Sequence, residues 1–72
     1  MFKFTLLKSE YFGRIDRGFA RVSCKDLETD RTNVYQFFFS HTSGTWEFYY
    51  EPKNMPNDEF LRDEMEKWFI QG

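Results

Sequence analysis

A chain of 72 residues with a net charge of −2 and one cysteine sets narrow limits on the class of protein. So short a chain forms one domain, residues 1–72, and buries only about 60% of its unfolded surface. The 10 Phe, 4 Tyr and 2 Trp compensate, because each buried ring removes roughly 150–250 Å² from water.

The lone cysteine and the first ten residues bear on location. Cys24 can form neither an internal disulfide nor a zinc knuckle. Lys3 and Lys8 interrupt the opening residues, which contain no apolar run of signal-peptide length. No stretch approaches the roughly 20 apolar residues of a membrane span. We therefore expect a cytoplasmic protein without a membrane partner.

The first half of the chain has the pattern of two strands. A period of two predicts a half-buried strand over Phe2–Ser9. Two glycines and an aspartate predict a loop over Tyr11–Gly18. A second strand follows near Phe19–Lys25, and the polar segment Asp26–Thr32 is expected to be a loop. The small apolar row of the second strand belongs inward: Ala20, Val22 and Cys24.

Residues 33–51, NVYQFFFSHTSGTWEFYYE, predict two aromatic strands joined by a polar turn, His41-Thr42-Ser43-Gly44. If Ser40 and Thr45 close the loop, six rings lie on one face. The expected cross-strand pairs are then Tyr35–Tyr50, Phe37–Phe48 and Phe39–Trp46. A tighter turn around Ser43-Gly44 moves the register by two residues and keeps both faces.

After Pro52, which ends the hairpin, the period changes to 3.6 and predicts a helix with Pro56 at its first position and Gly72 at its end. The apolar side is expected to contain Phe60, Leu61, Met65, Trp68 and Phe69. The polar side is expected to contain Asp58, Arg62, Asp63, Glu66 and Lys67. Arg62–Glu66 and Asp63–Lys67 have the spacing of ion pairs.

These elements predict an α+β fold, ββββα. It is a four-stranded antiparallel sheet, three-stranded at the least, arranged as a meander with the helix packed on one face. The helix should cover the face that carries most of the rings, because a stripe of rings opposite an amphipathic helix forms a core. The other face of the sheet is then left uncovered.

That second face holds the candidate binding residues Phe19, Arg21, Lys25, Phe38 and Tyr49. Exposed rings beside cations can stack on nucleobases or anchor a protein interface. The structural alternative is that Phe38 and Tyr49 only fill a minor cluster with Leu27 or Phe12.

Few residues suggest chemistry. His41 is the only histidine and is expected in a turn, whereas Cys24 points inward, so neither a metal site nor a nucleophilic pair is indicated. The helix carboxylates form a solvated face, and the glycines match no phosphate-binding pattern. We expect no enzyme activity, no metal and no cofactor.

Two segments, Gly18-Phe19-Ala20-Arg21-Val22 and residues 33–41, resemble the RNA-binding segments of cold-shock domains. The resemblance covers less than half of the chain and implies nucleic-acid binding. The tryptophan-bearing first strand of that family is absent, and a C-terminal helix has no place in its all-β barrel. The chain is therefore not assigned to that family.

The charge is uneven, with +4 over residues 1–25 and −6 over residues 26–72, which favours internal complementarity or a partner surface. We expect a non-catalytic protein-binding module, a stoichiometric inhibitor or adaptor. Its size suits the anti-CRISPR or anti-restriction proteins that phages and mobile elements direct at host defence. The acidic helix face could imitate phosphates through Asp58, Glu59, Asp63 and Glu66. The alternatives are a single-stranded nucleic-acid-binding domain and a homodimer through the aromatic face or a sheet edge.

Overall fold

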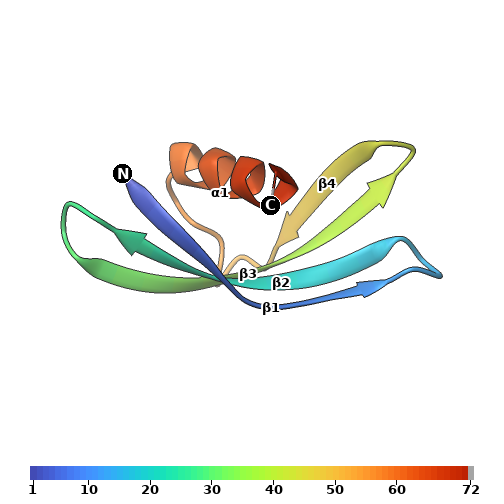
Figure 1. Cartoon of the computed structure of the whole chain (residues 1–72), viewed down its shortest axis with the longest axis horizontal. Coiled ribbons are helices and arrows are strands. Elements are labelled where there is room, and N and C mark those ends of the chain that lie inside the picture. Colours follow the sequence, from blue (N-terminus) through green and yellow to red (C-terminus); the bar gives the residue numbers. More distant parts are fainter. Residues whose placement is uncertain (72) are drawn as a thin grey trace.

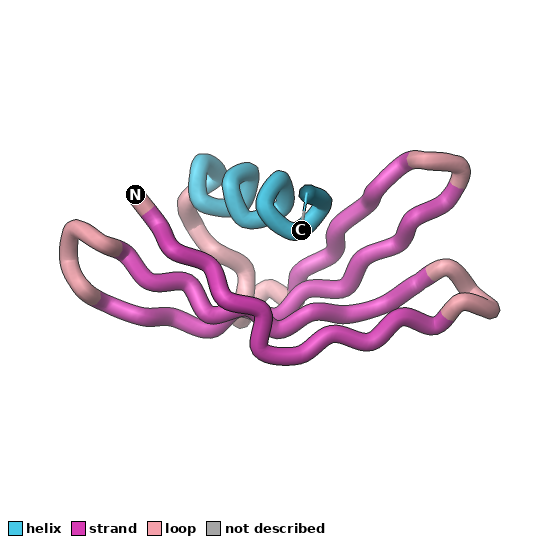
Figure 2. The backbone as a smooth tube through the Cα atoms, in the orientation of Figure 1, coloured by secondary structure: helices cyan, strands magenta, loops and turns pink. Residues whose placement is uncertain are grey.

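A computed structural model describes residues 1–71 and contains four strands followed by one helix. The elements are β1 (Phe2–Phe12), β2 (Arg17–Asp26), β3 (Arg31–Thr42), β4 (Thr45–Tyr50) and α1 (Glu59–Gln71). The sheet is antiparallel in the order β1-β2-β3-β4, so each strand pairs with its neighbour in sequence (Figure 2). The predicted ββββα meander is confirmed. The predicted helix end at Gly72 lies outside the described residues.

The strands are longer than their side-chain patterns predict. Tyr11 pairs with Gly18, so the loop predicted over Tyr11–Gly18 is confirmed only at residues 13–16, and its two ends belong to the strands. The loop predicted over Asp26–Thr32 is likewise shorter than expected, because Asp26 pairs with Arg31 and only residues 27–30 turn the chain. A hairpin continues while backbone groups find partners across it, and polar side chains that face water do not end it.

Of the two alternative turns considered for the aromatic hairpin, the tighter one, around Ser43-Gly44, is the one that forms. Ser43 and Gly44 have φ values of 55° and 78°, as a type I′ turn requires, and Thr42 pairs with Thr45. The register expected from a loop closed by Ser40 is therefore wrong by two residues, although both faces keep their members. The aromatic pairs are Phe37–Tyr50, Phe39–Phe48 and His41–Trp46, which places His41 in a strand rather than in the turn.

A β-bulge interrupts β1. Leu6 pairs with Val22 and Lys8 pairs with Arg21, so Leu7 is left between them without a partner. An extra residue exchanges the two faces of the strand from that point on. Side chains at even numbers face the helix before the bulge and face away from it afterwards. Leu6 itself is 45% exposed, less buried than expected.

The core lies between the sheet and α1 on the face predicted for it. Its buried apolar side chains are Ala20, Val22, Cys24, Phe37, Phe39, Leu61 and Met65. The Phe69 ring packs edge-on against Phe37 at 5.2 Å and lies 4.9 Å from Phe39, as measured between ring centroids. Closely spaced aromatic pairs of this kind stabilise beyond the area they bury, which lets a short chain hold a core.

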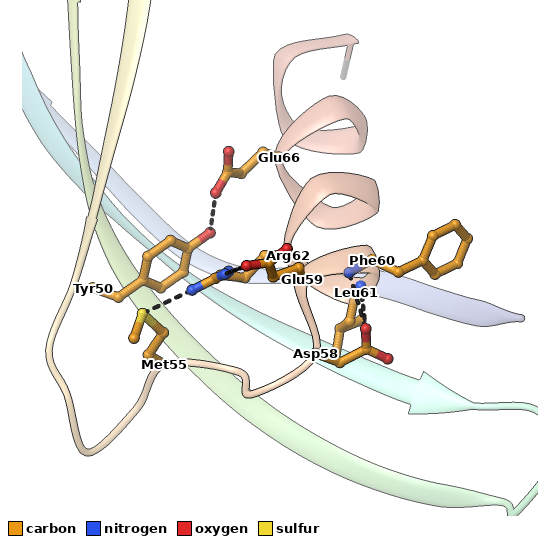
Figure 3. A network of polar contacts seen from close by, with 8 residues as sticks. All are labelled: Tyr50, Met55, Asp58, Glu59, Phe60, Leu61, Arg62 and Glu66. Carbon is orange, nitrogen blue, oxygen red and sulfur yellow. Dashed lines mark hydrogen bonds and ion pairs between the residues drawn. The ribbon is translucent and has the colours of Figure 1, made fainter.

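The helix begins three residues later than predicted. Asp58 caps it, since its Oδ1 accepts hydrogen bonds from the backbone N–H of Phe60 at 2.9 Å and of Leu61 at 3.4 Å (Figure 3). Pro56 therefore lies outside the helix, where it is buried. Phe60 was expected on the apolar side but is 63% exposed, because the later start leaves it in the first turn, beyond the core.

The helix also uses other polar partners than its spacing predicts. Arg62 pairs with Glu59 at 3.7 Å, and Glu66 accepts a hydrogen bond of 2.7 Å from the Tyr50 hydroxyl (Figure 3). Within residues 1–71 the predicted Arg62–Glu66 and Asp63–Lys67 pairs do not form. Arg62 instead contacts Glu59 and donates from Nη1 to Met55 Sδ at 3.0 Å in the preceding loop, and the bond from Tyr50 on β4 draws Glu66 away from Arg62. Pairs along an exposed helix surface are weak enough to be replaced in this way.

The helix is too small to cover the whole sheet. The molecule is 40 Å long, whereas 13 helical residues extend only about 20 Å. α1 lies along one side of the sheet, and no described element covers the opposite side (Figure 1). That uncovered side, called the open face below, is a broad surface that α1 leaves available for binding.

Candidate binding surface on the open face

The open face is made by the side chains that alternate with the buried row of β2 and β3. Strand pairing places them in rows that cross the sheet. From one end of the sheet to the other these rows are Phe12–Arg17–Ser40–Glu47, Glu10–Phe19–Phe38–Tyr49, Lys8–Arg21–Gln36, Thr5–Ser23–Val34 and Lys3–Lys25–Thr32.

The second of these rows brings three predicted binding residues together. Phe19 pairs with Phe38, and Phe38 pairs with Tyr49 on the other side. The rings of Phe19 and Phe38 lie 6.4 Å apart. Phe38 is 43% exposed and Tyr49 is 51% exposed. These three residues, called the aromatic row below, form a continuous apolar strip across β2, β3 and β4.

The predicted alternative, a minor cluster closed by Leu27 or Phe12, is not what forms. Leu27 follows the end of β2, eight residues beyond Phe19, and Phe12 pairs with Arg17 in the neighbouring row. Both side chains are about half exposed. The row therefore stays accessible to a partner.

One predicted cation belongs with the aromatic row and one does not. Arg21 lies in the next row, where its Nε and Nη2 donate to the Gln36 side-chain oxygen at 3.3 and 3.1 Å. Lys25 is six residues further along β2 than Phe19, about 20 Å away, and pairs with Asp30 at 3.0 Å. Lys25 is therefore not part of the same site.

Three further charged residues surround the aromatic row and were not predicted. Lys8 lies 5.9 Å above the Phe19 ring and 3.8 Å from Glu10. Arg17 occupies the row beside the rings. Strand alternation alone does not predict that Lys8 or Glu10 faces this side, because the bulge at Leu7 exchanges the faces of β1. Arg17 was missed because it was assigned to a loop.

Tyr49 is held in place at the edge of the site. Its hydroxyl donates a hydrogen bond to Glu47, two residues earlier on the same face. That bond, together with desolvation, raises the pKa of the Tyr49 hydroxyl. The phenol therefore stays protonated at neutral pH, with an apolar ring surface and a fixed polar end.

The acidic helix residues are mostly engaged within the chain. Asp58 caps the helix, Glu59 pairs with Arg62 and Glu66 binds the Tyr50 hydroxyl. Asp63 is exposed and has no side-chain partner within residues 1–71. The four carboxylates thus do not form one free acidic surface.

The candidate catalytic groups are far apart. Cys24 is 3% exposed, and burial, with a smaller effect of Asp26, raises the pKa of its thiol. It pairs with Asn33, and His41 lies eight residues further along β3, about 26 Å away. His41 instead stacks on Trp46 with ring centroids 4.4 Å apart. Within residues 1–71, no three His, Cys, Asp or Glu side chains gather as a metal site would require.

Two open concavities lie near the end of the sheet that carries the β1–β2 and β3–β4 turns. One of about 350 Å³ lies against the aromatic row and is lined by Arg17, Gly18, Phe38, Phe39 and Tyr49. The other, of about 460 Å³, is on the helix side and is lined by Tyr11, Phe39, His41, Trp46, Phe69 and Ile70. The first adds a recess to the open face.

α1 is too short and too polar to span a membrane, and it is the one helix of the described chain. Comparison with family models, curated proteins and solved structures gives no significant match. The function must therefore be inferred from the surface itself.

Proposed function

We propose that this chain is a non-catalytic protein-binding module that acts stoichiometrically, as an inhibitor or an adaptor, through its open face. The observation that carries this proposal is the aromatic row, Phe19–Phe38–Tyr49, on a side of the sheet that no described element covers. A strip of half-exposed rings on a chain of this size marks an interaction site.

The polar residues around the row favour a protein partner. Glu10 lies at one end and Glu47 beside the other, whereas Lys8, Arg17 and Arg21 flank the rings. An apolar centre with a rim of both charges is the anatomy of a protein interface, where aromatic residues and Arg are enriched. Because the three basic residues around the row outnumber the two acidic ones, the partner should carry a mainly acidic rim around an apolar centre.

The acidic face of the helix is a weaker candidate for the binding surface than the open face, because a phosphate mimic needs free carboxylates. Three of its four candidate carboxylates already serve the fold. Small inhibitors encoded by phages and mobile elements, including anti-CRISPR and anti-restriction proteins, bind in the stoichiometric way proposed here, and we extend the proposal to that class.

Affinity capture with two matched variants tests the proposal. Phe38→Ser removes the ring at the centre of the aromatic row. Phe60→Ser is the control, because it removes another exposed phenylalanine ring, on the helix side of the molecule. The wild-type chain and Phe60→Ser should recover the same protein from nuclease-treated extracts of the native cell, and Phe38→Ser should not. Equal recovery by all three chains would reject the open face as the binding surface.

Single-stranded nucleic-acid binding is the second candidate, because Lys8, Arg17 and Arg21 lie beside stackable rings. The Glu10 and Glu47 carboxylates near both ends of the row oppose it, since they would repel phosphates. A titration of mixed oligonucleotides should therefore be flat. Binding that weakens with salt and with Phe38→Ser would replace the protein-binding proposal.

A further inference from the structure

The two edges of the sheet are protected to very different degrees. β1 has a bulge at Leu7 and carries Lys3 and Lys8, and bulges and lysines are devices that block pairing with another chain. β4, TWEFYY, has no bulge, proline or lysine, and Glu47 is its one charged residue. Four of its six residues are aromatic, a composition that favours strand pairing.

The turn determines which backbone groups of β4 face outward. A two-residue loop makes its flanking residues, Thr42 and Thr45, a hydrogen-bonded pair. Every second residue of β4 then bonds to β3 as well, so Trp46, Phe48 and Tyr50 direct their N–H and C=O groups away from the sheet. Within residues 1–71 no other segment pairs with this side.

We propose that two copies of this chain pair through β4, antiparallel and centred on Phe48, in a symmetric dimer. Trp46 of one copy then pairs with Tyr50 of the second copy, and both outward-facing backbone sets are satisfied. This inference does not depend on the proposed function.

The register follows from the side chains of the strand. A twofold axis at Phe48 places Glu47 opposite Tyr49 of the second copy, a phenol that already donates to Glu47 in its own chain. An axis at Glu47 would oppose two carboxylates, which is unfavourable. An axis at Tyr49 would leave Trp46 without a partner at the end of the strand. The register at Phe48 is therefore the most complementary.

Such a dimer would form one eight-stranded sheet with both helices on the same side. The open faces of the two copies would join along β4, so that each Tyr49 lies beside Glu47 of its own copy and Glu47 of the second copy. The partner-binding surface of the working molecule would be twice as wide as that of one chain.

Two single-cysteine variants test the register, each in a Cys24→Ala background. In the proposed dimer residue 47 of one copy and residue 49 of the second copy form a non-hydrogen-bonded pair. Their Cα atoms are about 4.5 Å apart, within reach of a disulfide. Identical positions are diagonal neighbours, about 7–8 Å apart, and too far to bridge. A mixture of Glu47→Cys and Tyr49→Cys chains should therefore form a disulfide-linked dimer on mild oxidation, and each variant alone should not.

Sedimentation equilibrium of the wild-type chain provides the independent measurement. A mass that rises towards twice that of one chain with concentration is expected. A constant monomer mass would overturn the proposal, as would equal crosslinking in all three cysteine samples or none in the mixture. Both substituted residues are exposed, so circular dichroism should confirm that the variants are folded.

Discussion

At the scale of single residues, Gly18 shows how closely the strands and rings approach. A Cβ atom there would collide with the Glu10 backbone carbonyl oxygen and lie 2.6 Å from the Phe39 ring. Gly18 pairs with Tyr11 and Phe39. The position was assigned to a loop because glycine is typical of turns, whereas its role here is to admit an aromatic ring over a strand.

Gly18→Ala should therefore destabilise the protein, by about 1–3 kcal/mol as for other overpacked sites. Gly13→Ala is the matched control, because the nearest atom to an added Cβ there is a Tyr11 ring carbon at 3.9 Å. Urea denaturation of both variants measures the difference. Equal stability of the two variants would contradict the close approach.

At the scale of elements, the helix start depends on one side chain. Asp58 Oδ1 accepts from the N–H groups of Phe60 and Leu61, and its own carbonyl accepts from Arg62 at 3.1 Å. These bonds satisfy donors that a helix end leaves free. A carboxylate at this end also stabilises the helix dipole.

Asp58→Ala should lower the free energy of unfolding by about 0.5–2 kcal/mol, the usual value of an N-cap. Asp58→Asn keeps an acceptor oxygen and should lose much less. Asp63→Ala, on the exposed side of the same helix, should be close to neutral. Thermal melts followed by circular dichroism distinguish the three variants, and an Asp63→Ala variant as unstable as Asp58→Ala would argue against capping.

Element types could be predicted from the sequence, and element ends could not. Periods of two and 3.6 reflect which side chains are buried, so they identify strands and the helix. Strand ends depend on backbone pairing across the hairpin, which the side chains of Tyr11 or Arg31 do not reveal. The aromatic row was predictable because alternation fixes faces. Its neighbours Lys8 and Glu10 were not, because the β1 bulge leaves no mark in the sequence.

At the scale of the whole molecule, the part of the helix that the structure describes is joined to the sheet by apolar packing and by a hydrogen bond between Tyr50 and Glu66. The Tyr50 hydroxyl on β4 donates to Glu66 on α1 at 2.7 Å (Figure 3). Burial, and then this bond to a carboxylate, raises the pKa of Tyr50 well above its ordinary value of 10.0. The folded protein therefore retains a proton that the unfolded chain releases near pH 10.

This link should make stability depend on pH in the alkaline range. Because the folded pKa is raised, the contribution of Tyr50 is complete below about pH 10 and is lost as the pH rises from there towards the folded pKa. Tyr50→Phe should lose about 0.5–1.5 kcal/mol at pH 7 through the missing hydrogen bond. Its stability should then fall less steeply than that of the wild type above pH 10.

Urea denaturation of both chains between pH 7 and pH 11 measures this difference. The wild type serves as the control for Tyr11, Tyr35 and Tyr49, whose pKa values are also raised and which both chains share. Parallel pH curves would show that Tyr50 does not carry the effect.

The order of the strands has a consequence for synthesis on the ribosome. Each strand after β1 pairs with the strand made just before it, so the nascent chain can form its sheet through local contacts. The cover for the rings of that sheet, residues 59–71, is translated after all four strands. Until this segment leaves the exit tunnel, the rings of Phe37 and Phe39 are exposed to solvent, so this interval of translation is when a chaperone would matter most.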